Sequence, residues 1–335
     1  MILVTGGTGL VGSHLLYKLI SEDKKVIAVT RDLKYIKEIE CLFKFYSKEY
    51  KNHLNKISWI EGDLNDNTFV YSLLKNVKKV YHCAAEVTFE AKKRKGSYSN
   101  FTITRNIVNA CLANDIKKLC HVSSIAALPS SENGKAITEK DGWPKENYSA
   151  YADGKTKSEF EVFRGIQEGL DAVIVIPSVI IGPGRFDRGS GRIFSTVYNG
   201  LNYYTEGSAG FIDVFDVADI MIKLMESEYS GERYLISGGN LSFKLFLELI
   251  AKYLKVKPPE KYISKKSLEK LVKLESLKSF LLGTKQRIHK DGIGAMTTKN
   301  IYDPVKIKEL LDYSFLSVER AIERTSEYFR FCQNI

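Results

Sequence analysis

A glycine-rich loop near the amino terminus restricts the fold of this chain more than any other feature. The run Thr5-Gly6-Gly7-Thr8-Gly9-Leu10-Val11-Gly12 follows a short apolar segment directly and opens a helical pattern. Glycine is needed where a chain turns sharply, where backbone approaches a phosphate and where a helix packs closely on a strand. A helix start also offers free N–H groups to an anion. Although glycines fill ordinary turns too, this placement predicts a dinucleotide-binding strand–loop–helix unit.

Short apolar runs alternate with helical patterns through the first half of the chain. The runs are rich in β-branched residues, as expected of strands buried on both faces, and they are Ile2–Thr5, Lys25–Thr30, Ile57–Glu61, Lys79–Cys83, Lys118–Ser123 and Ala172–Ile176. Repeated strand–helix–strand units predict an α/β fold, with a doubly wound parallel sheet of the Rossmann type and right-handed crossovers.

The pattern changes after Pro177, where glycine and aromatic residues become frequent. A strand–helix–strand pattern returns between residues 211 and 236, and the remainder is mainly helical. We therefore expect two lobes. The expected cofactor domain comprises residues 1–176 plus 211–238, and the smaller, mainly helical substrate lobe comprises residues 177–210 plus 239–335.

The net charge of +10 raises the question of a nucleic-acid partner. The lysines are spread along the whole chain and interleaved with Glu and Asp, without zinc-finger spacing or a basic-region heptad. We therefore expect a solvated lysine-rich surface and no nucleic-acid binding. The candidate helix 265–282 is basic and amphipathic, and we interpret it as a lobe helix packed over the substrate pocket rather than a membrane-surface helix.

The cysteine pattern and the apolar runs bear on the compartment. The 5 cysteines have irregular spacing and no C-x-x-C pair, which predicts free thiols rather than a disulfide framework or a metal site. The apolar run 172–181 is interrupted by Pro177 and is too short for stable membrane insertion. With no visible signal peptide, we expect a cytoplasmic protein.

The second predicted strand ends at Arg31-Asp32, where dinucleotide-binding proteins choose their cofactor. An arginine at this place pairs with the extra phosphate of NADP, whereas an acidic residue accepts the ribose hydroxyls of NAD. We favour NADP over NAD on Arg31, with two alternatives left open: Asp32 turns toward the ribose, or Arg31 faces solvent.

A Y-x-x-x-K motif, Tyr151 to Lys155, supplies candidate acid–base chemistry. Residues four apart share one face of a helix, so the ammonium can lie near the phenol and hold the cofactor's ribose. A nearby cation is expected to lower the phenol pKa toward operating pH. Ser123 and Ser124 end the fifth predicted strand, at the sheet edge where ligands bind, and either hydroxyl could orient a carbonyl.

Together these motifs resemble the extended short-chain dehydrogenase/reductase family, which includes NAD-dependent epimerases and dehydratases. The resemblance assigns catalysis to Ser124, Tyr151 and Lys155, with Asn100 in support and Ser123 beside Ser124. Its implied cofactor contacts, beyond Arg31, Ser123, Tyr151 and Lys155, are Thr5, Gly6, Thr8, Gly9, Leu10, Val11, Gly12, Asp63, Leu64, Cys83, Ala84, Ala85, Pro177, Ser178 and Val179. Relatives are often dimers through the two long helices near Asn100 and Tyr151, so a homodimer is an expectation from resemblance.

The branch of the family decides the substrate. Sugar-nucleotide epimerases of this family usually carry Asn where this chain has Val179 and Arg where it has Ala209. The stretch 177–183 and the Arg31-Asp32 strand end are more similar to the dihydroflavonol reductase and 3β-hydroxysteroid dehydrogenase branch. Six aromatic residues are candidates for an apolar pocket or for the lobe core: Phe186, Phe194, Tyr198, Tyr203, Tyr204 and Phe211. Ile176 stands where many relatives have an arginine.

The interpretation that follows is an NADP-dependent oxidoreductase acting on a CH–OH group. It would interconvert a secondary alcohol and a ketone or aldehyde on a small, fairly apolar substrate, with no bound metal. One alternative is an epimerase or isomerase of a sugar nucleotide that holds NAD tightly. The other is a binding protein that senses NADP without catalysis, which retention of Tyr151 and Lys155 disfavours.

Overall fold

A parallel sheet forms the centre of the molecule. The computed structural model describes residues 1–85, 94–131, 134–145, 149–282 and 290–334. Within them, a 7-stranded sheet has the order β10-β6-β5-β4-β1-β2-β3, and every neighbouring pair is parallel. The strands are β1 (Ile2–Thr5), β2 (Val26–Thr30), β3 (Ile57–Glu61), β4 (Lys79–His82), β5 (Lys118–Val122), β6 (Ala172–Pro177) and β10 (Arg233–Ile236).

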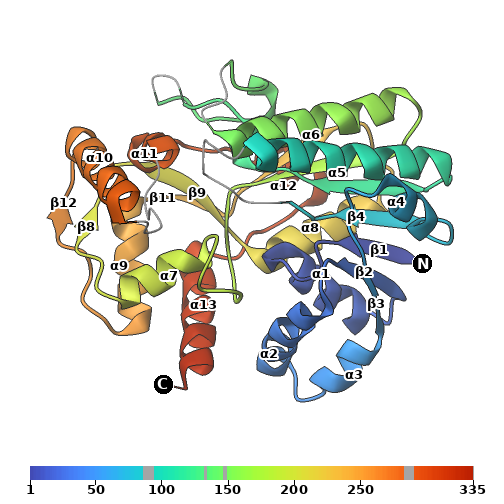
Figure 1. The fold of residues 1–335 in the computed structure, drawn as a ribbon, viewed down its shortest axis with the longest axis horizontal. Coiled ribbons are helices and arrows are strands. Elements are labelled where there is room, and N and C mark those ends of the chain that lie inside the picture. Colours follow the sequence, from blue (N-terminus) through green and yellow to red (C-terminus); the bar gives the residue numbers. More distant parts are fainter. Residues whose placement is uncertain (86–93, 132–133, 146–148, 283–289, 335) are drawn as a thin grey trace.

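Helices cover both faces of this sheet (Figure 1). One face packs on α4 (Asn67–Leu73), α5 (Arg94–Ala113) and α6 (Ala150–Gln167). The other packs on α1 (Leu10–Ser21), α2 (Ile36–Tyr46), α8 (Val214–Glu226) and α12 (Val305–Leu311), with α3 (Tyr50–Asn55) beside α2. Successive residues of a strand face opposite sides, so β5 sends Cys120 and Val122 into one apolar core and Leu119 into the other.

A second, smaller sheet lies beside the first. Its order is β11-β9-β7, built from β7 (Val179–Ile181), β9 (Ser208–Asp213) and β11 (Gly239–Ser242). The helices α7 (Gly191–Tyr198), α9 (Phe243–Leu254) and α13 (Val318–Gln333) pack around it. In that core, the rings of Phe211 and Phe246 stack with centroids 4.2 Å apart.

The outermost elements of the small lobe are β8 (Tyr203–Tyr204), β12 (Lys261–Tyr262), α10 (Lys265–Leu282) and α11 (Lys290–Thr297). Leu268 and Val272 of α10 are buried against Ile293 of α11. The described part of the basic segment 265–282 therefore packs as a lobe helix. The side chains after Lys273 lie outside the described residues, as do those at 94–98 and 290–291.

Topology places the small lobe at the carboxyl edge of the central sheet. Its first elements follow the end of β6 directly, and β11 follows the end of β10 after two residues. Figure 1 shows this lobe beside the sheet, on the side away from the amino terminus. In open parallel sheets ligands bind at this edge, where strand order reverses between β1 and β4. The predicted α/β class and doubly wound sheet are confirmed.

One segment of the carboxyl-terminal third returns to the large sheet. Ile307 of α12 is fully buried in the core formed with α1 and α8, and Tyr302 is buried in the core beneath α5 and α6. The sequence-based partition had placed both residues with the small lobe. The mainly helical pattern after residue 239 did not indicate that this segment would pack on the central sheet.

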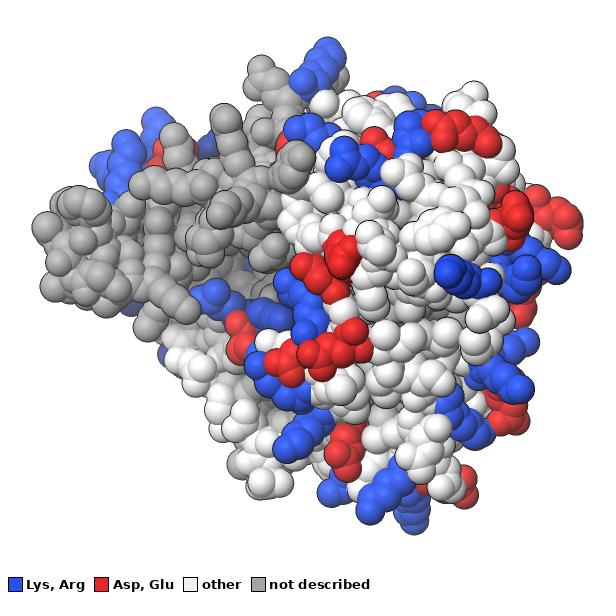
Figure 2. Space-filling model, turned by 45° about the vertical axis from the view of Figure 1, so that its right-hand side comes forward, with Lys and Arg blue, Asp and Glu red and all other residues white. Residues whose placement is uncertain are grey.

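The surface carries both charges. On the face shown in Figure 2, lysine and arginine side chains lie among Asp and Glu over the described area. Surface ion pairs include Lys252–Glu319 at 2.9 Å and Lys257–Glu260 at 3.1 Å. Among the described helices, none combines the length and apolar character that a membrane crossing requires.

Candidate active site

The glycine loop between β1 and α1 has room only for glycine at two positions. Gly6 has φ +67°, and a Cβ there would lie 2.7 Å from the backbone nitrogen of Ala84. A Cβ on Gly12 would lie 2.2 Å from the carbonyl oxygen of Gly6. Both contacts are too short for real atoms, so the loop must stay free of side chains here. The chain thus brings β1 and the end of β4 together as a smooth backbone surface.

The start of α1 suits a phosphate. Its N-cap is Gly9, which provides no capping side chain, and its first turn, beginning Leu10-Val11-Gly12, holds no acidic residue. The first N–H groups of such a helix carry partial positive charge and lack helical partners. The predicted residues Thr8, Gly9 and Leu10 therefore stand at a site that fits a pyrophosphate.

A buried hydrogen-bond chain holds the loop to the neighbouring strand. The backbone N–H of Ala84 donates to Thr5 Oγ1 at 3.2 Å, and Thr5 lies 2.8 Å from His82 Nδ1. His82 Nε2 lies 3.1 Å from Thr104 Oγ1, which donates to the carbonyl of Asn100 at 2.9 Å. The Thr104 hydroxyl donates its hydrogen to the Asn100 carbonyl. His82 must therefore donate from Nε2 to Thr104 Oγ1 and accept from Thr5 at Nδ1.

That chain requires a neutral imidazole. Burial lowers the pKa of His82 to about 3, so the ring carries no charge at neutral pH. The chain connects two predicted site residues, Thr5 of the phosphate loop and Asn100 of α5. His82 and Thr104 are not among the predicted site residues, although His82 begins the run that ends the fourth strand and Thr104 stands one turn beyond Asn100 in the segment that resembles the family.

Arg31 and Asp32, the two residues at the end of β2 that could select NADP or NAD, differ in their contacts. The Asp32 carboxylate accepts a hydrogen bond from the Lys34 backbone N–H at 2.9 Å and pairs with Lys34 Nζ at 2.5 Å. Asp32 is thereby engaged as the cap of the short turn Leu33–Tyr35. Arg31 is exposed and has no acidic partner among the described residues. Asp32 is therefore engaged within its own turn, whereas Arg31 extends from the end of β2 into solvent.

The loop after β3 is fixed by a residue that was not predicted as a site residue. Asn106 of α5 donates from Nδ2 to the carbonyls of Leu64 and Asn65, at 3.0 and 3.1 Å. Leu64 is buried, whereas Asp63 is exposed and accepts from Asn65. Asp63 is therefore held at the sheet edge, two strands from the phosphate loop, where an adenine contact is expected from resemblance.

Tyr151, Ser124 and Lys155 come together between β5 and α6. Ser124 lies close enough to the Tyr151 phenol to lower its pKa, and Lys155 Nζ donates to the Val122 carbonyl at 2.7 Å. Lys155 is buried, and burial lowers its pKa to about 8. Asn100 is also buried, at 3% exposure, on the facing helix α5.

The phenol pKa differs from the sequence-based expectation. We expected a nearby cation to lower the pKa of Tyr151, but desolvation raises it above its ordinary value, against a smaller lowering by Ser124. The ammonium of Lys155 is turned to the end of β5 rather than to the phenol. In this arrangement Tyr151 is protonated at neutral pH, as a proton donor must be.

A buried carboxylate fastens this group to the sheet. Glu159 is fully buried one helical turn after Lys155, and Ser123 donates to its Oε1. Its Oε2 accepts from Trp143 Nε1 at 2.7 Å and from Arg233 Nη1 at 2.9 Å. The guanidinium of Arg233 also lies 4.3 Å from the centre of the Trp143 ring. Ser123 is thus bound to Glu159, while Ser124 faces Tyr151.

Many relatives have an arginine at the position of Ile176, and in this chain Arg233 supplies a buried cation on the neighbouring strand. Ile176 is fully buried in the core beneath α5 and α6. On the adjacent strand β10, Leu235 pairs with Ile176 and Arg233 pairs with Ile174, so Arg233 extends from the same face of the sheet. The buried cation on this face therefore comes from β10 and not from β6.

The remaining predicted residues line the ends of β4 and β6. Cys83 and Ala84 are partly buried beside the glycine loop, Ala85 is exposed, and burial raises the pKa of the Cys83 thiol to about 12. Pro177 ends β6, and the Ser178 N–H donates to Ile236 at 2.9 Å. Ser178 Oγ is buried without a hydrogen-bond partner among the described residues. Val179 begins β7 and is partly buried.

The aromatic residues considered for an apolar pocket divide into two groups. Phe194 and Phe211 are buried in the core of the small lobe, where Phe186 packs against Phe329 with ring centroids 4.8 Å apart. Tyr198 and Tyr203 are exposed. For the phenylalanines the core interpretation is therefore correct.

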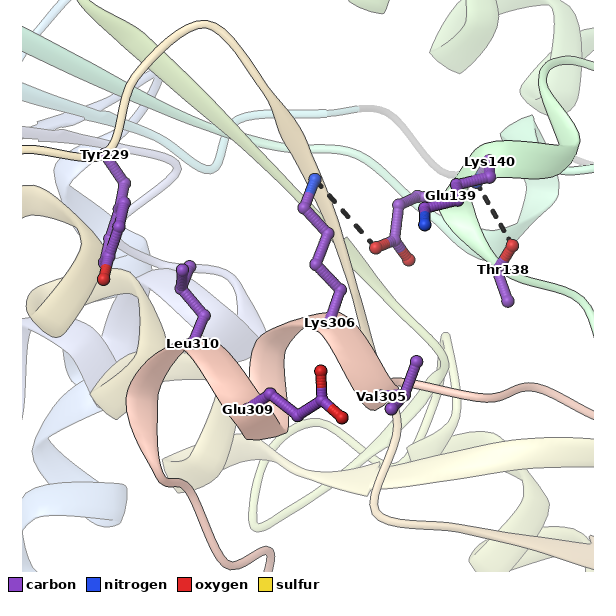
Figure 3. Close-up of a pocket in the computed structure, with 8 residues that line it drawn as sticks. All are labelled: Thr138, Glu139, Lys140, Tyr229, Val305, Lys306, Glu309 and Leu310. Atoms are coloured by element: carbon purple, nitrogen blue, oxygen red, sulfur yellow. Dashed lines mark hydrogen bonds and ion pairs between the residues drawn. The ribbon is translucent and has the colours of Figure 1, made fainter.

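A separate cavity of about 520 Å³ lies at the outer edge of β10 (Figure 3). It is lined by Thr138, Glu139, Lys140, Tyr229, Val305, Lys306, Glu309 and Leu310. Lys306 Nζ points toward Glu139, 4.0 Å from its Oε1, and donates to the Arg233 carbonyl at 3.0 Å. None of the predicted site residues lines this cavity.

Comparison with known proteins places the chain in a family. Residues 2–237 match the model of the NAD dependent epimerase/dehydratase family. The chain belongs to this family. It is therefore an enzyme of the NAD(P)-dependent oxidoreductase type that acts on small molecules.

Relatives within the epimerase/dehydratase family carry different activities in their names. A putative dihydroflavonol 4-reductase of Synechocystis sp. is 26% identical over 335 residues, covering 98% of this chain and 94% of the relative. The sterol demethylase protein B of Methylococcus capsulatus is 26% identical over 249 residues, covering 73% and 72%. A UDP-glucose 4-epimerase of Thermotoga maritima with UDP-glucose has the same fold, with TM-score 0.77, 19% identity and 99% of both chains covered.

We predict that stability falls in mild acid because buried histidines cannot accept protons. Burial lowers the pKa of His14 and of His82 to about 3 and that of His121 well below its usual value. Since the unfolded histidines bind protons below their ordinary pKa of about 6.5, the folded state loses about 1.4 kcal/mol per pH unit for each histidine as pH falls toward 3. Urea unfolding at several pH values measures this slope.

His121→Leu is the matched variant for that measurement. Neither ring nitrogen of His121 has a hydrogen-bond partner among the described residues, so its removal breaks no bond there. The variant should reduce the slope of unfolding free energy against pH by the contribution of one histidine, about 1.4 kcal/mol per pH unit. An unchanged slope would contradict the assignment of His121 as a buried neutral group.

We predict that Arg233→Met destabilises the fold by about 3–5 kcal/mol, because it leaves the Glu159 carboxylate buried and unpaired. Adding Glu159→Gln should recover part of the loss, since the remaining group is then neutral. The control Arg185→Met breaks partly exposed pairs with Glu38 and Asp187 and should cost about 1 kcal/mol or less. Denaturant unfolding measures all three, and equal losses at both sites would refute the prediction.

Proposed function

We propose that the chain is an NADP-dependent reductase that interconverts a secondary alcohol and a ketone or aldehyde on a small, fairly apolar substrate. The observation that carries the proposal is the position of Ser124 beside the Tyr151 phenol at the carboxyl end of β5, with Lys155 buried next to them. The proposal also depends on the cofactor residues named for the candidate site and on the chemistry of the family.

Tyr151 acts as the proton donor in this proposal. Its raised pKa keeps the phenol protonated at neutral pH, so it can protonate the alkoxide that forms when a carbonyl is reduced. Ser124, which lies beside Tyr151, would hold the carbonyl oxygen within reach of that proton. The bound nicotinamide supplies or accepts the hydride.

Lys155 holds positive charge near the reacting oxygen. Its pKa of about 8 leaves it mostly protonated at neutral pH, and Val122 fixes the ammonium at the end of β5. Positive charge fixed where negative charge develops stabilises the transition state without reorganisation. The carboxylate of Glu159, one turn along α6, keeps the strand end and the helix in register through Ser123.

The choice of NADP follows from the end of β2. Asp32 is held by Lys34, and Arg31 is exposed with its donors available for a 2′-phosphate. Thr5, Gly6, Thr8, Gly9, Leu10, Val11 and Gly12 would hold the pyrophosphate, with Asp63 and Leu64 at the adenine and Cys83, Ala84, Ala85, Pro177, Ser178 and Val179 along the nicotinamide side.

An apolar substrate is supported by what stands at the two sugar-nucleotide positions. Val179 lies at the start of β7, and Ala209 is buried in the core of the small lobe. Neither side chain can hydrogen-bond a sugar or pair with a diphosphate. The dihydroflavonol 4-reductase name of the Synechocystis relative, which matches nearly the whole chain, agrees with this choice.

We predict that NADPH binds at least about tenfold more tightly than NADH, a difference of about 1.4 kcal/mol. Arg31→Ala should remove that preference by weakening NADPH about tenfold while leaving NADH nearly unchanged, because only NADPH carries the phosphate. Fluorescence titration of cofactor-free protein measures both. The exposed arginine Arg192 provides the control Arg192→Ala. Preference for NADH, or NAD that stays bound through purification, would favour the epimerase alternative.

We predict that Tyr151→Phe lowers kcat by at least about 10²-fold, since the ring remains but the proton is lost. The probe is a panel of ketones and aldehydes that includes dihydroquercetin, with NADPH oxidation followed by absorbance. NADPH affinity should stay within about threefold, which separates chemistry from binding. Tyr71→Phe, at an exposed tyrosine of α4, is the matched control. Full turnover by Tyr151→Phe would overturn the proposed mechanism.

A further inference from the structure

We propose that Cys41 and Cys332 form an oxidation site, which a small disulfide such as glutathione disulfide converts to an intramolecular disulfide between α2 and α13. The two sulfurs lie 3.9 Å apart although the residues are 291 positions apart in sequence. The pair is separate from the candidate active site and its oxidation does not depend on the proposed reductase function.

Aromatic packing beside the two cysteines holds α2 and α13 next to each other. Phe45 of α2 packs on Tyr328 and Phe331 of α13, with ring centroids 5.1 and 5.5 Å apart. These contacts hold the two helices together before any bond forms. A disulfide requires sulfurs about 2 Å apart, and Cys332 stands in the last turn of α13, which ends at Gln333. Side-chain rotation and a small shift of this terminal turn can close the gap.

Access and hydrogen bonding distinguish this pair from the other cysteines. Cys332 is exposed and Cys41 partly exposed, whereas Cys111 and Cys120 are buried, and Cys83, which is also partly exposed, has a thiol whose pKa burial raises to about 12. Tyr328 is one turn before Cys332, and its hydroxyl is within hydrogen-bonding reach of both sulfurs. A hydroxyl donor stabilises a thiolate, which is the reactive form. Partial burial raises the pKa of Cys332 to about 11, so the reaction quickens as pH rises.

The chemistry proceeds by two exchange steps. The Cys332 thiolate attacks one sulfur of glutathione disulfide, which releases one glutathione thiolate and leaves a mixed disulfide. The Cys41 thiolate then attacks the Cys332 sulfur and releases the second glutathione. The protein loses two protons and two electrons, which are recovered in two molecules of reduced glutathione.

The bond would join elements that serve different lobes. Phe329 of α13 is buried in the core of the small lobe, and α2 packs on the central sheet just after Arg31. Closing a loop of this length removes much freedom from the unfolded chain, so the oxidised protein should melt at higher temperature. The disulfide should also hold α13 of the small lobe against α2, which packs on the central sheet.

The test treats the reduced full-length protein with glutathione disulfide at pH 8.5, blocks remaining thiols by alkylation, and maps peptides by mass spectrometry. The expected product is a monomer whose Cys41 and Cys332 peptides are joined. Its Tm should exceed that of the reduced protein by about 5 °C. Tyr328→Phe should slow formation of the bond by roughly threefold, because the donor to the sulfurs is lost.

Two variants complete the experiment. Cys41→Ser should stop at a stable glutathione adduct on Cys332 and show no rise in Tm, whereas Cys111→Ser, which removes a buried thiol, should still form the cross-link. Separate adducts on both cysteines in the unaltered chain, a dimer joined through Cys332, or two thiols that stay reduced would overturn the proposal. A cross-link without a higher Tm would refute the claim that it clamps α13.

Discussion

The buried carboxylate of Glu159 is the interaction on which the arrangement of the candidate site depends. It joins the end of β5 through Ser123, the loop that carries Trp143 and the edge strand β10 through Arg233. A fully buried charge is costly unless it is paired and hydrogen-bonded, so these partners cannot drift independently. Since α6 also carries Tyr151 and Lys155, fixing Glu159 sets the distance from these groups to Ser124.

A second constraint is the close approach of backbone at the point where strand order reverses. Gly6 and Ala84 meet with no room for a side chain, and the hydrogen bonds from Ala84 to Thr5 and on to His82 hold them there. The same neutral imidazole reaches α5 through Thr104. The phosphate loop and the helix that carries Asn100 are therefore parts of one buried network, although they are far apart in the chain.

Local patterns were sufficient to predict the fold and to name Tyr151, Lys155 and the serines at the end of the fifth strand as a candidate group, whereas Asn100 and Asp63 came from the family resemblance. Alternating strands and helices, the glycine spacing and the Y-x-x-x-K spacing are properties of neighbouring residues, and the predicted doubly wound sheet is confirmed. Glu159 could have been suspected, because it continues the Tyr151–Lys155 face by one more turn. Arg233 could not, since it is 74 residues from Glu159 and meets it only when β10 joins the sheet. The pKa of Tyr151 likewise depends on burial, which sequence spacing does not express.

The two lobes contribute different parts of the candidate site, which explains why the fold alone does not select a substrate. The central sheet supplies the phosphate loop and the Ser124–Tyr151–Lys155 group, and a UDP-glucose 4-epimerase has the same fold over nearly all of its length. In the proposed function, discrimination among alcohols, ketones and sugar nucleotides would come from the small lobe, where β7 is apolar and β9 has Ser208 and Asp213 at its ends. In the proposed reductase, a polar substrate would leave water without gaining a hydrogen-bond partner at Val179, which carries no polar group. An apolar substrate gives up no such partner there, so the apolar β7 is consistent with the proposed substrate class.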